Sequence, residues 1–494
     1  MKNALLFKSI NSNTYLYDSK NCNILYAHPL LRRICELFEQ INDSKVVLSH
    51  LMLEFPDYSN DEISYYFDKY FYLKENGFFE STDYSEKLSG KISVETIIKQ
   101  LSNLDNLVFQ VTNDCNLQCR YCCYGELYEN PKNMYNGPLS FETAKKVIDF
   151  LCEFWNSSKN QSHNNVIGIG FYGGEPLLNF DLITKIVSYV EGLKITTSPK
   201  FVYNMTTNAM LLDRYMDYLV EHNFSILLSL DGDKEGDYLR VDKHNHASFD
   251  RVFSNIKKLQ VKYPDFFAER ISFNSLLNVK SSAEDIYNFI FREFGKTPAI
   301  SSISINGVRK DKIDEFKTIY KSYDEQNMLS KMLKDKSLHY KDLGFFFYYH
   351  LENAYRQYCD LLMTKKSRTI KIPTGTCIPF FRKMFITSNG DILVCERIGL
   401  QHVLGHVSDK VDLDFDKVVE TYNGYYSFIK QQCAQCYHAD DCPECFLQFP
   451  FSSGGPVCPS LFDEERQKQH LGNIVSTLED DPSCFNIVNK FVFA

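Results

Sequence analysis

The stretch Cys115-Asn116-Leu117-Gln118-Cys119-Arg120-Tyr121-Cys122 places three cysteines at the spacing C-x3-C-x2-C, directly after the apolar run 107–111. Three thiolates on one short loop can hold three irons of a [4Fe–4S] cluster, whereas the usual protein cluster has four thiolate ligands. The missing ligand would leave one iron open to a small molecule, as catalytic metals keep an open position. The alternatives are half of a zinc site, a disulfide pair with one spare thiol, and three buried thiols.

The chain has 494 residues, a net charge of −9 and 16 cysteines. This length allows two or three domains. The acidic balance argues against a general nucleic-acid binder, which would need a basic face. We expect no membrane span, because no apolar run reaches about 18 residues. Many cysteines without a secretion signal predict a cytoplasmic protein that uses them for metal binding rather than disulfides.

Residues 1–90 predict a small unit of their own. A hairpin is expected at 14–18 and 23–26, followed by helices at 29–41, 45–54 and 60–73. This order favours a winged helix-turn-helix module, which would bind DNA or pack without a ligand. The unit carries 9 Lys and Arg against 13 Asp and Glu, so DNA is a poor partner.

From about residue 100 to 310 the pattern alternates between strands and helices. Strands are predicted at 107–112, 167–172, 201–206, 225–230, 271–276 and 300–306. Helices are predicted at 141–155, 182–192, 211–222, 249–261 and 283–293. Six strands in this order imply a parallel sheet in an α/β fold, curved as a partial (β/α)6 TIM-like barrel. Its active site would lie at the carboxyl ends of the strands, where the cysteine loop begins.

A second motif, Gly173-Gly174-Glu175-Pro176, follows the second predicted strand. Alone it is compatible with a plain turn. With the cysteine loop it resembles the radical SAM enzymes over about residues 105–310. The resemblance implies that S-adenosylmethionine (SAM) chelates the open iron of a cluster held by Cys115, Cys119 and Cys122. The remaining SAM contacts that it implies are Tyr121 beside the adenine, Gly173, Gly174, Glu175 and Pro176 at the methionyl end, and Asn208 and Ser229 in two further motif turns. Arg240 is the candidate for the SAM carboxylate, with a surface salt bridge as the alternative.

A cysteine-rich region at 371–470 is expected after a helical connector at 311–370 and before a tail at 471–494. Its spaced cysteines are Cys377, Cys395, Cys433, Cys436, Cys442, Cys445 and Cys458. A paired zinc knot is the alternative for 433–445. The pattern resembles the SPASM extension of radical SAM enzymes, which implies two auxiliary [4Fe–4S] clusters. The outer cluster would take Cys433, Cys436, Cys442 and Cys458, and the inner one Cys377, Cys395 and Cys445.

The inner cluster would then have an open iron or an eighth cluster ligand, for which Cys359 is a candidate if it is not a core residue. The cysteines interpreted as structural are Cys22, Cys35, Cys152 and Cys484, and Cys123, which adjoins Cys122, is interpreted as a non-ligand. Glu396 follows Cys395 and is a candidate proton acceptor. This position resembles an acidic residue of the sulfatase maturases.

The N-terminal unit resembles the leader-recognition domain of enzymes that mature ribosomal peptides. That resemblance implies a precursor peptide whose leader adds a strand to the small sheet. The expected reaction is an intramolecular thioether or carbon–carbon crosslink, made through a 5′-deoxyadenosyl radical. An external one-electron donor such as flavodoxin or ferredoxin would be needed. The alternatives are a sulfatase-type maturase that oxidises Cys or Ser to formylglycine, and a non-enzymatic scaffold with degenerate clusters.

Overall fold

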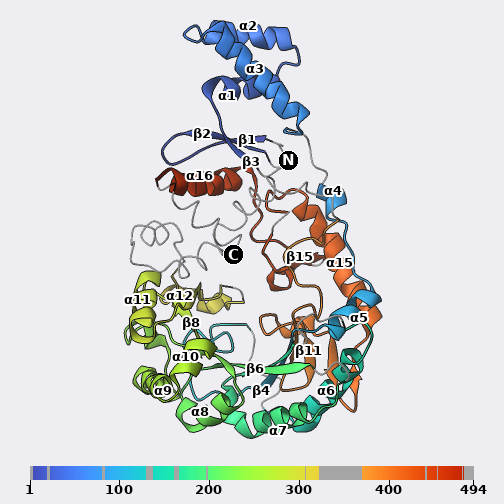
Figure 1. Cartoon of the computed structure of the whole chain (residues 1–494), viewed down its shortest axis with the longest axis vertical. Coiled ribbons are helices and arrows are strands. Elements are labelled where there is room, and N and C mark those ends of the chain that lie inside the picture. Colours follow the sequence, from blue (N-terminus) through green and yellow to red (C-terminus); the bar gives the residue numbers. More distant parts are fainter. Residues whose placement is uncertain are drawn as a thin grey trace.

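The computed structural model describes residues 4–18, 23–79, 84–129, 137–160, 166–195, 199–305, 307–321, 370–439, 442–452, 454–480 and 482. Most of the predicted connector at 311–370 lies outside these residues. The described part shows an N-terminal unit, a long helix beneath it, and a larger sheet-and-helix body (Figure 1).

The N-terminal unit combines a small antiparallel sheet with three helices. Its strands run in the order β1 (Ala4–Lys8), β2 (Thr14–Asp18) and β3 (Asn23–Tyr26). Its helices are α1 (Pro29–Phe38), α2 (Ser44–Glu54) and α3 (Asn60–Glu75), and the short α4 (Tyr84–Lys87) follows. The predicted hairpin and helices appear, whereas β1 was not predicted. Its five residues are mostly apolar and do not alternate, so the sequence alone did not identify a strand. The winged-helix assignment stays a prediction.

The larger body is built on six parallel strands, which confirms the predicted parallel sheet. They are β4 (Asn106–Thr112), β5 (Val166–Gly173), β6 (Lys200–Thr207), β7 (Ser225–Ser229), β8 (Ile271–Leu277) and β9 (Ala299–Ser302), paired in this order. The helices that accompany them are α5 (Val94–Ser102), α6 (Phe141–Trp155), α7 (Phe180–Glu191), α8 (Leu212–Glu221), α9 (Phe249–Lys262), α10 (Pro264–Arg270) and α11 (Ala283–Phe294). Helices α5 and α10 were not predicted. Pro264 stands in the first turn of α10, a position that proline favours.

The C-terminal region extends the same sheet. Strand β10 (Lys383–Ile386) pairs in parallel with β4, on the side away from β5. An antiparallel run continues through β11 (Asp391–Leu393), β12 (Gly405–Val407) and β13 (Val411–Asp412). The cysteine-rich region therefore starts beside the strand that carries the cysteine loop. The remaining described elements are α12 (Ile313–Lys317), α15 (Phe415–Cys433), β14 (Phe451–Ser452), β15 (Gly455–Pro456) and α16 (Glu464–Asp480).

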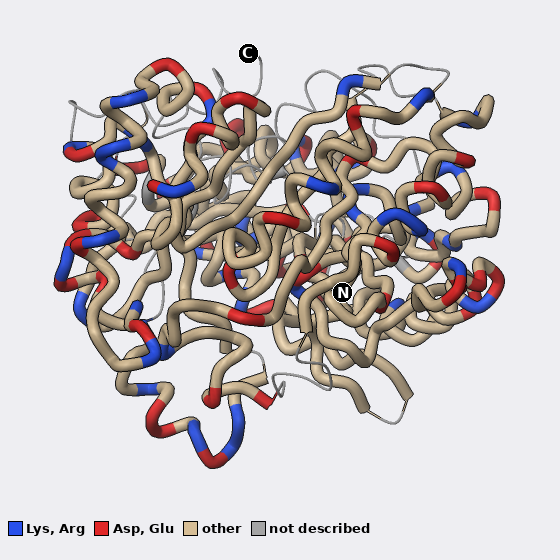
Figure 2. The backbone as a smooth tube through the Cα atoms, turned by 90° about the horizontal axis from the view of Figure 1, so that it is seen from below, with Lys and Arg blue, Asp and Glu red and all other residues tan. Residues whose placement is uncertain are grey.

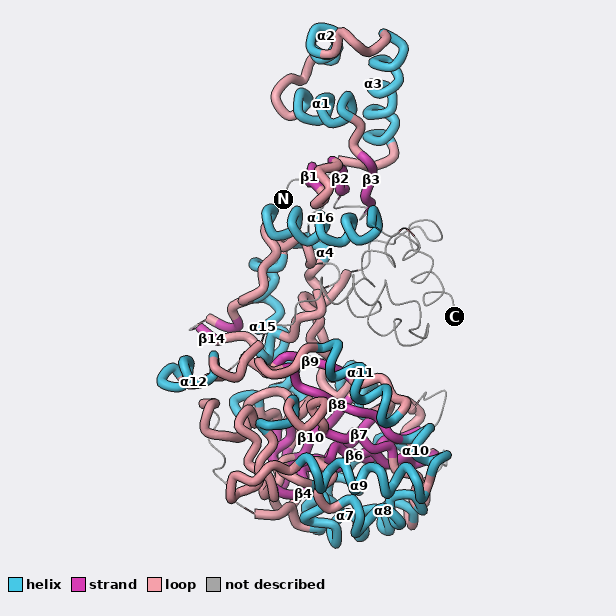
Figure 3. Tube along the Cα trace, turned by 90° about the vertical axis from the view of Figure 1, so that its left-hand side faces the viewer, coloured by secondary structure: helices cyan, strands magenta, loops and turns pink. Residues whose placement is uncertain are grey.

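Helix α16 packs against the N-terminal sheet and crosses the predicted boundary at residue 470. Figures 1 and 3 both place it directly beside β1–β3. Leu471 and Val475 of α16 and Tyr437 form an apolar cluster with Leu5 and Phe7 of β1. The opposite face of the small sheet meets the helices of the N-terminal unit, where Leu25 packs on their core. The sheet is thus covered on both faces.

Charged residues are mixed over the backbone when the molecule is seen from below (Figure 2). Lys and Arg alternate with Asp and Glu in that view, without a large region of one sign. Among the described helices, none has both the length and the apolar character that crossing a membrane requires.

Candidate functional site

The cysteine loop leaves the carboxyl end of β4 and lies against the segment that follows the short helix η2 (Gly236–Leu239). The N–H of Gln118 donates to the carbonyl of Val241 at 2.7 Å, and the N–H of Arg120 donates to the carbonyl of Leu239 at 3.0 Å. The loop is therefore held by its own strand and by a short backbone ladder from beyond β7.

The three thiols of the loop come together in a partly buried position. Burial, opposed by the charge of Arg240 and assisted by the thiols of Cys122 and Cys115, raises the pKa of Cys119 to about 12. The amide nitrogen of Asn208 lies 3.6 Å from the sulfur of Cys115. The structure thus brings the predicted trio together at the carboxyl edge of the sheet.

The chemistry of these donors fits an iron–sulfur cluster, for which thiolates are the usual ligands. In the described part of the chain, no three His, Cys, Asp or Glu side chains converge tightly enough for a single metal ion. Each thiolate of a four-iron cluster binds a different iron, so its ligands stand farther apart than those of one zinc. The C-x3-C-x2-C spacing also lacks the paired C-x2-C form that zinc sites usually have.

Gly173 and Gly174 bring the second motif against the end of β4. Gly173 has a φ of +150°, and a Cβ there would lie 2.3 Å from the carbonyl oxygen of Thr112. A Cβ on Gly174 would lie 2.2 Å from the carbonyl oxygen of Asp114. The N–H of Glu175 donates to that same carbonyl at 2.8 Å. Both positions need glycine because a side chain would separate the motif from the cysteine loop.

The carboxylate of Glu175 is fully buried and joins the second motif to the turn after β6. Its Oε1 accepts from the Thr207 hydroxyl at 2.7 Å and from the Leu177 N–H at 3.1 Å, and its Oε2 accepts from the Asn208 N–H at 2.7 Å. Burial outweighs these donors and raises the pKa of Glu175. Its contact with the methionyl end of SAM stays a prediction.

Arg240 lies below the cysteine loop and is 5% exposed, so the surface salt bridge alternative is wrong. Its Nη1 donates to the hydroxyl oxygen of Tyr121 at 2.8 Å, and that hydroxyl donates to Asp231 at 2.5 Å. Its Nε lies 3.6 Å from Asp237 Oδ1. That Arg240 binds the SAM carboxylate and that Tyr121 lies beside the adenine stay predictions.

The other predicted SAM contacts occupy the same edge of the sheet. Asn208 follows β6, and its side-chain amide donates to Asn116 of the loop at 2.7 Å. Ser229 ends β7, and Pro176 starts the short helix η1 (Pro176–Asn179). Ala209 has a φ of +61°, in the left-handed region that glycine adopts more readily than alanine.

A second group of thiols surrounds the buried ring of Tyr422 on α15. Burial raises the pKa of Tyr422 well above its usual value. The neighbouring Tyr426 and the thiols of Cys445, Cys395 and Cys377 raise it further. Burial also raises the pKa of Cys395 to about 11, with Cys445 among the contributing neighbours. These are the cysteines assigned to the inner auxiliary cluster.

A third group gathers at the end of α15. Burial, assisted by the thiols of Cys442, Cys436 and Cys458, raises the pKa of Cys433 to about 12. These are the four cysteines assigned to the outer cluster. The structure brings both predicted sets together, and the clusters themselves stay predictions.

Glu396 directly follows Cys395 of the second thiol group. Both of its carboxylate oxygens accept from Lys383 Nζ, at 2.9 and 2.8 Å. Burial, followed by the charges of Cys123 and Glu396, raises the pKa of Tyr172 at the end of β5. The carboxylate is thus held by Lys383 and lies close enough to Tyr172 to affect its pKa, and its role as proton acceptor stays a prediction.

Cys35 and Cys152 pack on hydrophobic clusters, as expected for structural residues. Cys123 is exposed. Cys22, Cys359 and Cys484 lie outside the described residues, so the proposed eighth ligand is not placed. Sequence reasoning missed the buried Asp237 and gave no role to Asp231, although Asp231 stands only two residues after Ser229.

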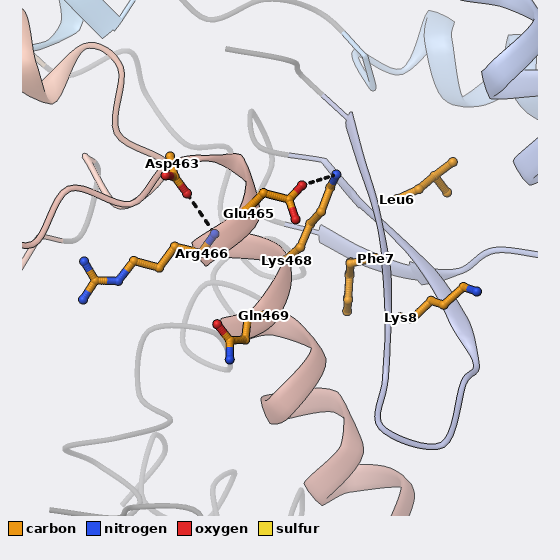
Figure 4. Close-up of a pocket in the computed structure, with 8 residues that line it drawn as sticks. All are labelled: Leu6, Phe7, Lys8, Asp463, Glu465, Arg466, Lys468 and Gln469. Atoms are coloured by element: carbon orange, nitrogen blue, oxygen red, sulfur yellow. Dashed lines mark hydrogen bonds and ion pairs between the residues drawn. The ribbon is translucent and has the colours of Figure 1, made fainter. Parts of the chain in front are cut away.

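A hollow of about 690 Å³ lies between β1 and the start of α16 (Figure 4). Leu6, Phe7 and Lys8 line one side, and charged residues of α16 such as Arg466 and Lys468 line the other. None of the predicted site residues lines it.

Comparison with known proteins agrees with this geometry. Residues 109–290 match the family model described as the Radical SAM superfamily. An uncharacterised protein of Methanocaldococcus jannaschii is 28% identical over 64% of this chain and 94% of its own. The radical SAM cyclopropyl synthase TigE of Paramaledivibacter caminithermalis is 24% identical over 66% of this chain, and the match spans only 63% of TigE.

A cysteine-type anaerobic sulfatase-maturating enzyme of Clostridium perfringens is 25% identical over 67% of this chain and 86% of its own. The solved structure of native anSMEcpe with bound AdoMet has a TM-score of 0.51 and 18% identity, and covers 78% of this chain and 99% of that one. The latter likeness concerns the fold. The family implies a [4Fe–4S] cluster and SAM as cofactors. Residues 109–290 are therefore a radical SAM domain, and the chain is similar to peptide-modifying and sulfatase-maturing members of the superfamily.

Proposed function

We propose that this radical SAM enzyme modifies a ribosomally made precursor peptide and installs an intramolecular thioether or carbon–carbon crosslink. The observation that carries the proposal is a small sheet, whose strand β3 pairs on one side only among the described strands, packed on α16 of the C-terminal region. The similarity to TigE, which is named for cyclopropyl synthesis, supports a bond-forming reaction.

The leader would dock on β3, which pairs only with β2 among the described strands. The N–H of Ala27 donates to the carbonyl of Thr14 at 2.9 Å, and the pairing continues with Leu25 opposite Leu16. Since inward and outward groups alternate along a strand, the N–H of Tyr26 points to the open edge. Its side chain is 60% exposed. An extended peptide could add a strand there through main-chain hydrogen bonds.

At the radical site, SAM bound to the cluster supplies the hydrogen-abstracting species in this family. The chain contributes the three loop thiolates and the buried turns that fix their position. Crosslinking also releases a proton and an electron. Glu396 is the candidate to accept the proton, and the inner thiol group would hold the cluster that takes up the electron. Flavodoxin or ferredoxin is the proposed source of the starting electron.

The test is anaerobic co-expression with the short reading frames that neighbour the gene, followed by mass spectrometry of their products. A crosslinked product loses a pair of hydrogens, and the bonds between the linked residues resist fragmentation. Recovery of every candidate peptide unmodified, by an enzyme that cleaves SAM, would contradict the proposal.

The leader dock has its own test in two variants at one position. Tyr26→Pro removes the outward N–H, and an edge position tolerates proline there. Tyr26→Val keeps the N–H and serves as the control. We expect processing to be lost in Tyr26→Pro and kept in Tyr26→Val, with SAM cleavage unchanged in both. Equal processing by the two variants would show that the leader does not add a strand at β3.

The second candidate is oxidation of Cys or Ser to formylglycine, which the similarity to the Clostridium perfringens maturase favours. A formylglycine carries a reactive aldehyde, whereas a crosslink does not. Labelling of the product by a hydrazide probe therefore distinguishes the two functions.

A further inference from the structure

Two carboxyl groups and one guanidinium are buried together beneath the cysteine loop. Asp231 and Asp237 are each 1% exposed and Arg240 is 5% exposed. Asp231 follows β7, whereas Asp237 and Arg240 belong to η2 and its end. Burial of charge is costly unless each group has a partner, so these residues need a role that offsets the cost.

The hydroxyl of Tyr121 connects this buried group to the loop. It donates to Asp231 Oδ2 at 2.5 Å and accepts from Arg240 Nη1 at 2.8 Å. Tyr121 immediately precedes Cys122, the last thiolate of the loop. The network therefore acts on the part of the chain that carries the radical site.

Asp231 is itself fixed on two further sides. Its Oδ1 accepts from the Leu276 N–H of β8 at 2.8 Å, and its own N–H donates to Asp237 Oδ1 at 3.0 Å. Each oxygen of Asp231 thus has one donor, from β8 and from the loop. The residue links the loop, β8 and η2 with a single side chain.

The network is incomplete around Arg240. Its Nε and the Oδ2 of Asp237 are buried without a hydrogen-bond partner in the described part of the chain. Buried polar atoms without partners are rare and usually serve a function. The guanidinium of Arg240 is therefore fixed in place by Tyr121 and Asp237, while its Nε still has a hydrogen to donate.

We propose that Asp231 and Asp237 are positioning residues that set Tyr121 and Arg240 for binding SAM. Asp231 orients the Tyr121 hydroxyl, and that hydroxyl and Asp237 together hold the guanidinium under the loop. The carboxylates serve the SAM site, because the side chains that they contact, Tyr121 and Arg240, are the ones predicted to bind SAM. The inference rests on membership of the radical SAM superfamily and not on the peptide substrate.

The test uses cluster-loaded protein with Asp231→Asn, Tyr121→Phe and the double variant. Asp231→Asn replaces one carboxylate oxygen with an NH2 group, so either Leu276 or Tyr121 loses its acceptor. Tyr121→Phe keeps the ring and removes the hydroxyl. Asp250→Asn is the control, because this substitution removes the same charge from an exposed residue of α9 that pairs with Lys234.

Two readouts are needed besides turnover. The first is iron per chain, and the second is SAM affinity, measured by the change that SAM makes in the electron paramagnetic resonance spectrum of the reduced cluster. We expect both single variants to keep wild-type iron and to bind SAM about tenfold more weakly, with an altered spectrum of the SAM complex. The double variant should bind SAM no more weakly than Tyr121→Phe alone, because Asp231 acts on SAM through the Tyr121 hydroxyl, which that variant already lacks.

SAM affinity within about twofold of wild type in both single variants, with an unchanged spectrum, would overturn the proposal. Loss of iron, with normal SAM affinity for each remaining cluster, would also overturn it and assign the network to cluster assembly. Failure of all precursor processing in the wild-type protein would leave the SAM measurement intact, so the two proposals fail separately.

Discussion

The hydroxyl of Tyr15 donates a hydrogen bond to the carboxylate of Glu479 at 2.6 Å, and so joins β2 to the last described helix. The same carboxylate accepts from the side-chain amides of Asn11 and Asn13, at 3.0 and 2.9 Å. Nearby, the backbone N–H of Ile10 donates to the Ser476 hydroxyl at 2.7 Å. The N-terminal sheet is therefore bonded, and not only packed, against α16.

Removing this carboxylate should loosen the sheet from the helix. We expect Glu479→Ala to destabilise the contact by about 1 kcal/mol, because the site is partly exposed and water replaces some of the lost hydrogen bonds. Hydrogen exchange of β1, β2 and α16 measures the effect. Glu465→Ala is the control, since Glu465 is an exposed carboxylate on the same helix that contacts only Lys468 in the described structure. Equal exchange in both variants would mean that the apolar cluster alone holds the sheet.

The same contact should weaken in acid. Burial works against the charge of Glu479, but hydrogen bonds from Tyr15, Asn13 and their neighbours outweigh it and lower its pKa. A lowered pKa contributes stability that is present above the unfolded value of about 4.3 and is lost as the pH falls through the folded value. Exchange of β1 and β2, corrected for its intrinsic pH dependence, should therefore rise below about pH 4 in the wild type. Glu479→Ala should show no such step.

Two glycine-to-alanine variants should move stability in opposite directions. Gly174→Ala places a Cβ against the Asp114 backbone, and we expect a loss of about 1–3 kcal/mol together with weaker SAM binding. Gly424→Ala lies in α15 with nothing within 4 Å, and we expect a gain of about 0.5–1 kcal/mol. Thermal unfolding of both variants gives the comparison. A neutral Gly174→Ala would mean that the motif can move away from the loop without cost.

The buried carboxylate of Glu175 should not tolerate an amide. Backbone N–H groups of Leu177 and Asn208 each need one of its oxygens, and a glutamine offers one oxygen only. We expect Glu175→Gln to cost about 1–3 kcal/mol, since one buried donor is left without a partner. Calorimetry measures this cost, with Glu142→Gln as an exposed control. A wild-type melting temperature would show that the turns do not depend on this side chain.

Glu396 should matter for product formation and not for SAM cleavage. If it accepts the substrate proton, Glu396→Gln should slow precursor modification by about 100-fold, while 5′-deoxyadenosine still forms in the absence of peptide. Glu396→Asp keeps the carboxylate and should retain part of the rate. The ratio of 5′-deoxyadenosine to modified peptide is the quantity to measure. An unchanged ratio in Glu396→Gln would remove this residue from the reaction.

Iron content should follow the thiol groups. With three four-iron clusters, reconstituted protein should hold about 12 irons, and replacing all three loop cysteines by alanine should leave about 8. Replacing Cys433 and Cys436 should remove the outer cluster and spare the spectrum of the loop cluster. About 4 irons in the wild type would contradict both auxiliary clusters.

The strand–helix pattern predicted the parallel sheet well because buried parallel strands are apolar and helices carry a clear 3.6-residue period. The cysteine loop and the Gly173-Gly174-Glu175-Pro176 motif also predicted where the site lies, since the residue types and spacing of a short motif are read directly from the sequence. Pairing between distant segments was beyond this reasoning. The sequence of 383–386 does not predict that this strand pairs with β4, because its register depends on a strand almost 280 positions away in the chain.

The site residues divide in the same way. Thiols and glycines were found because their types are unusual at those spacings. Asp237 was missed because an aspartate in an exposed-looking polar segment gives no sign of burial, and only the fold reveals that Arg240 and Asp231 enclose it. Helix α16 was taken as part of a tail, since its apolar residues make sense only once β1 lies beside them.

The contact between β1 and α16 also constrains how the protein is made. The bond from Ile10 to Ser476 spans 466 positions of the chain. At about 5–20 residues per second, the ribosome needs roughly 20–90 s to produce the helix after the strand has emerged. During that time Leu5 and Phe7 have no α16 to cover them, so the nascent chain depends on chaperones or on a slow final docking step for this one face.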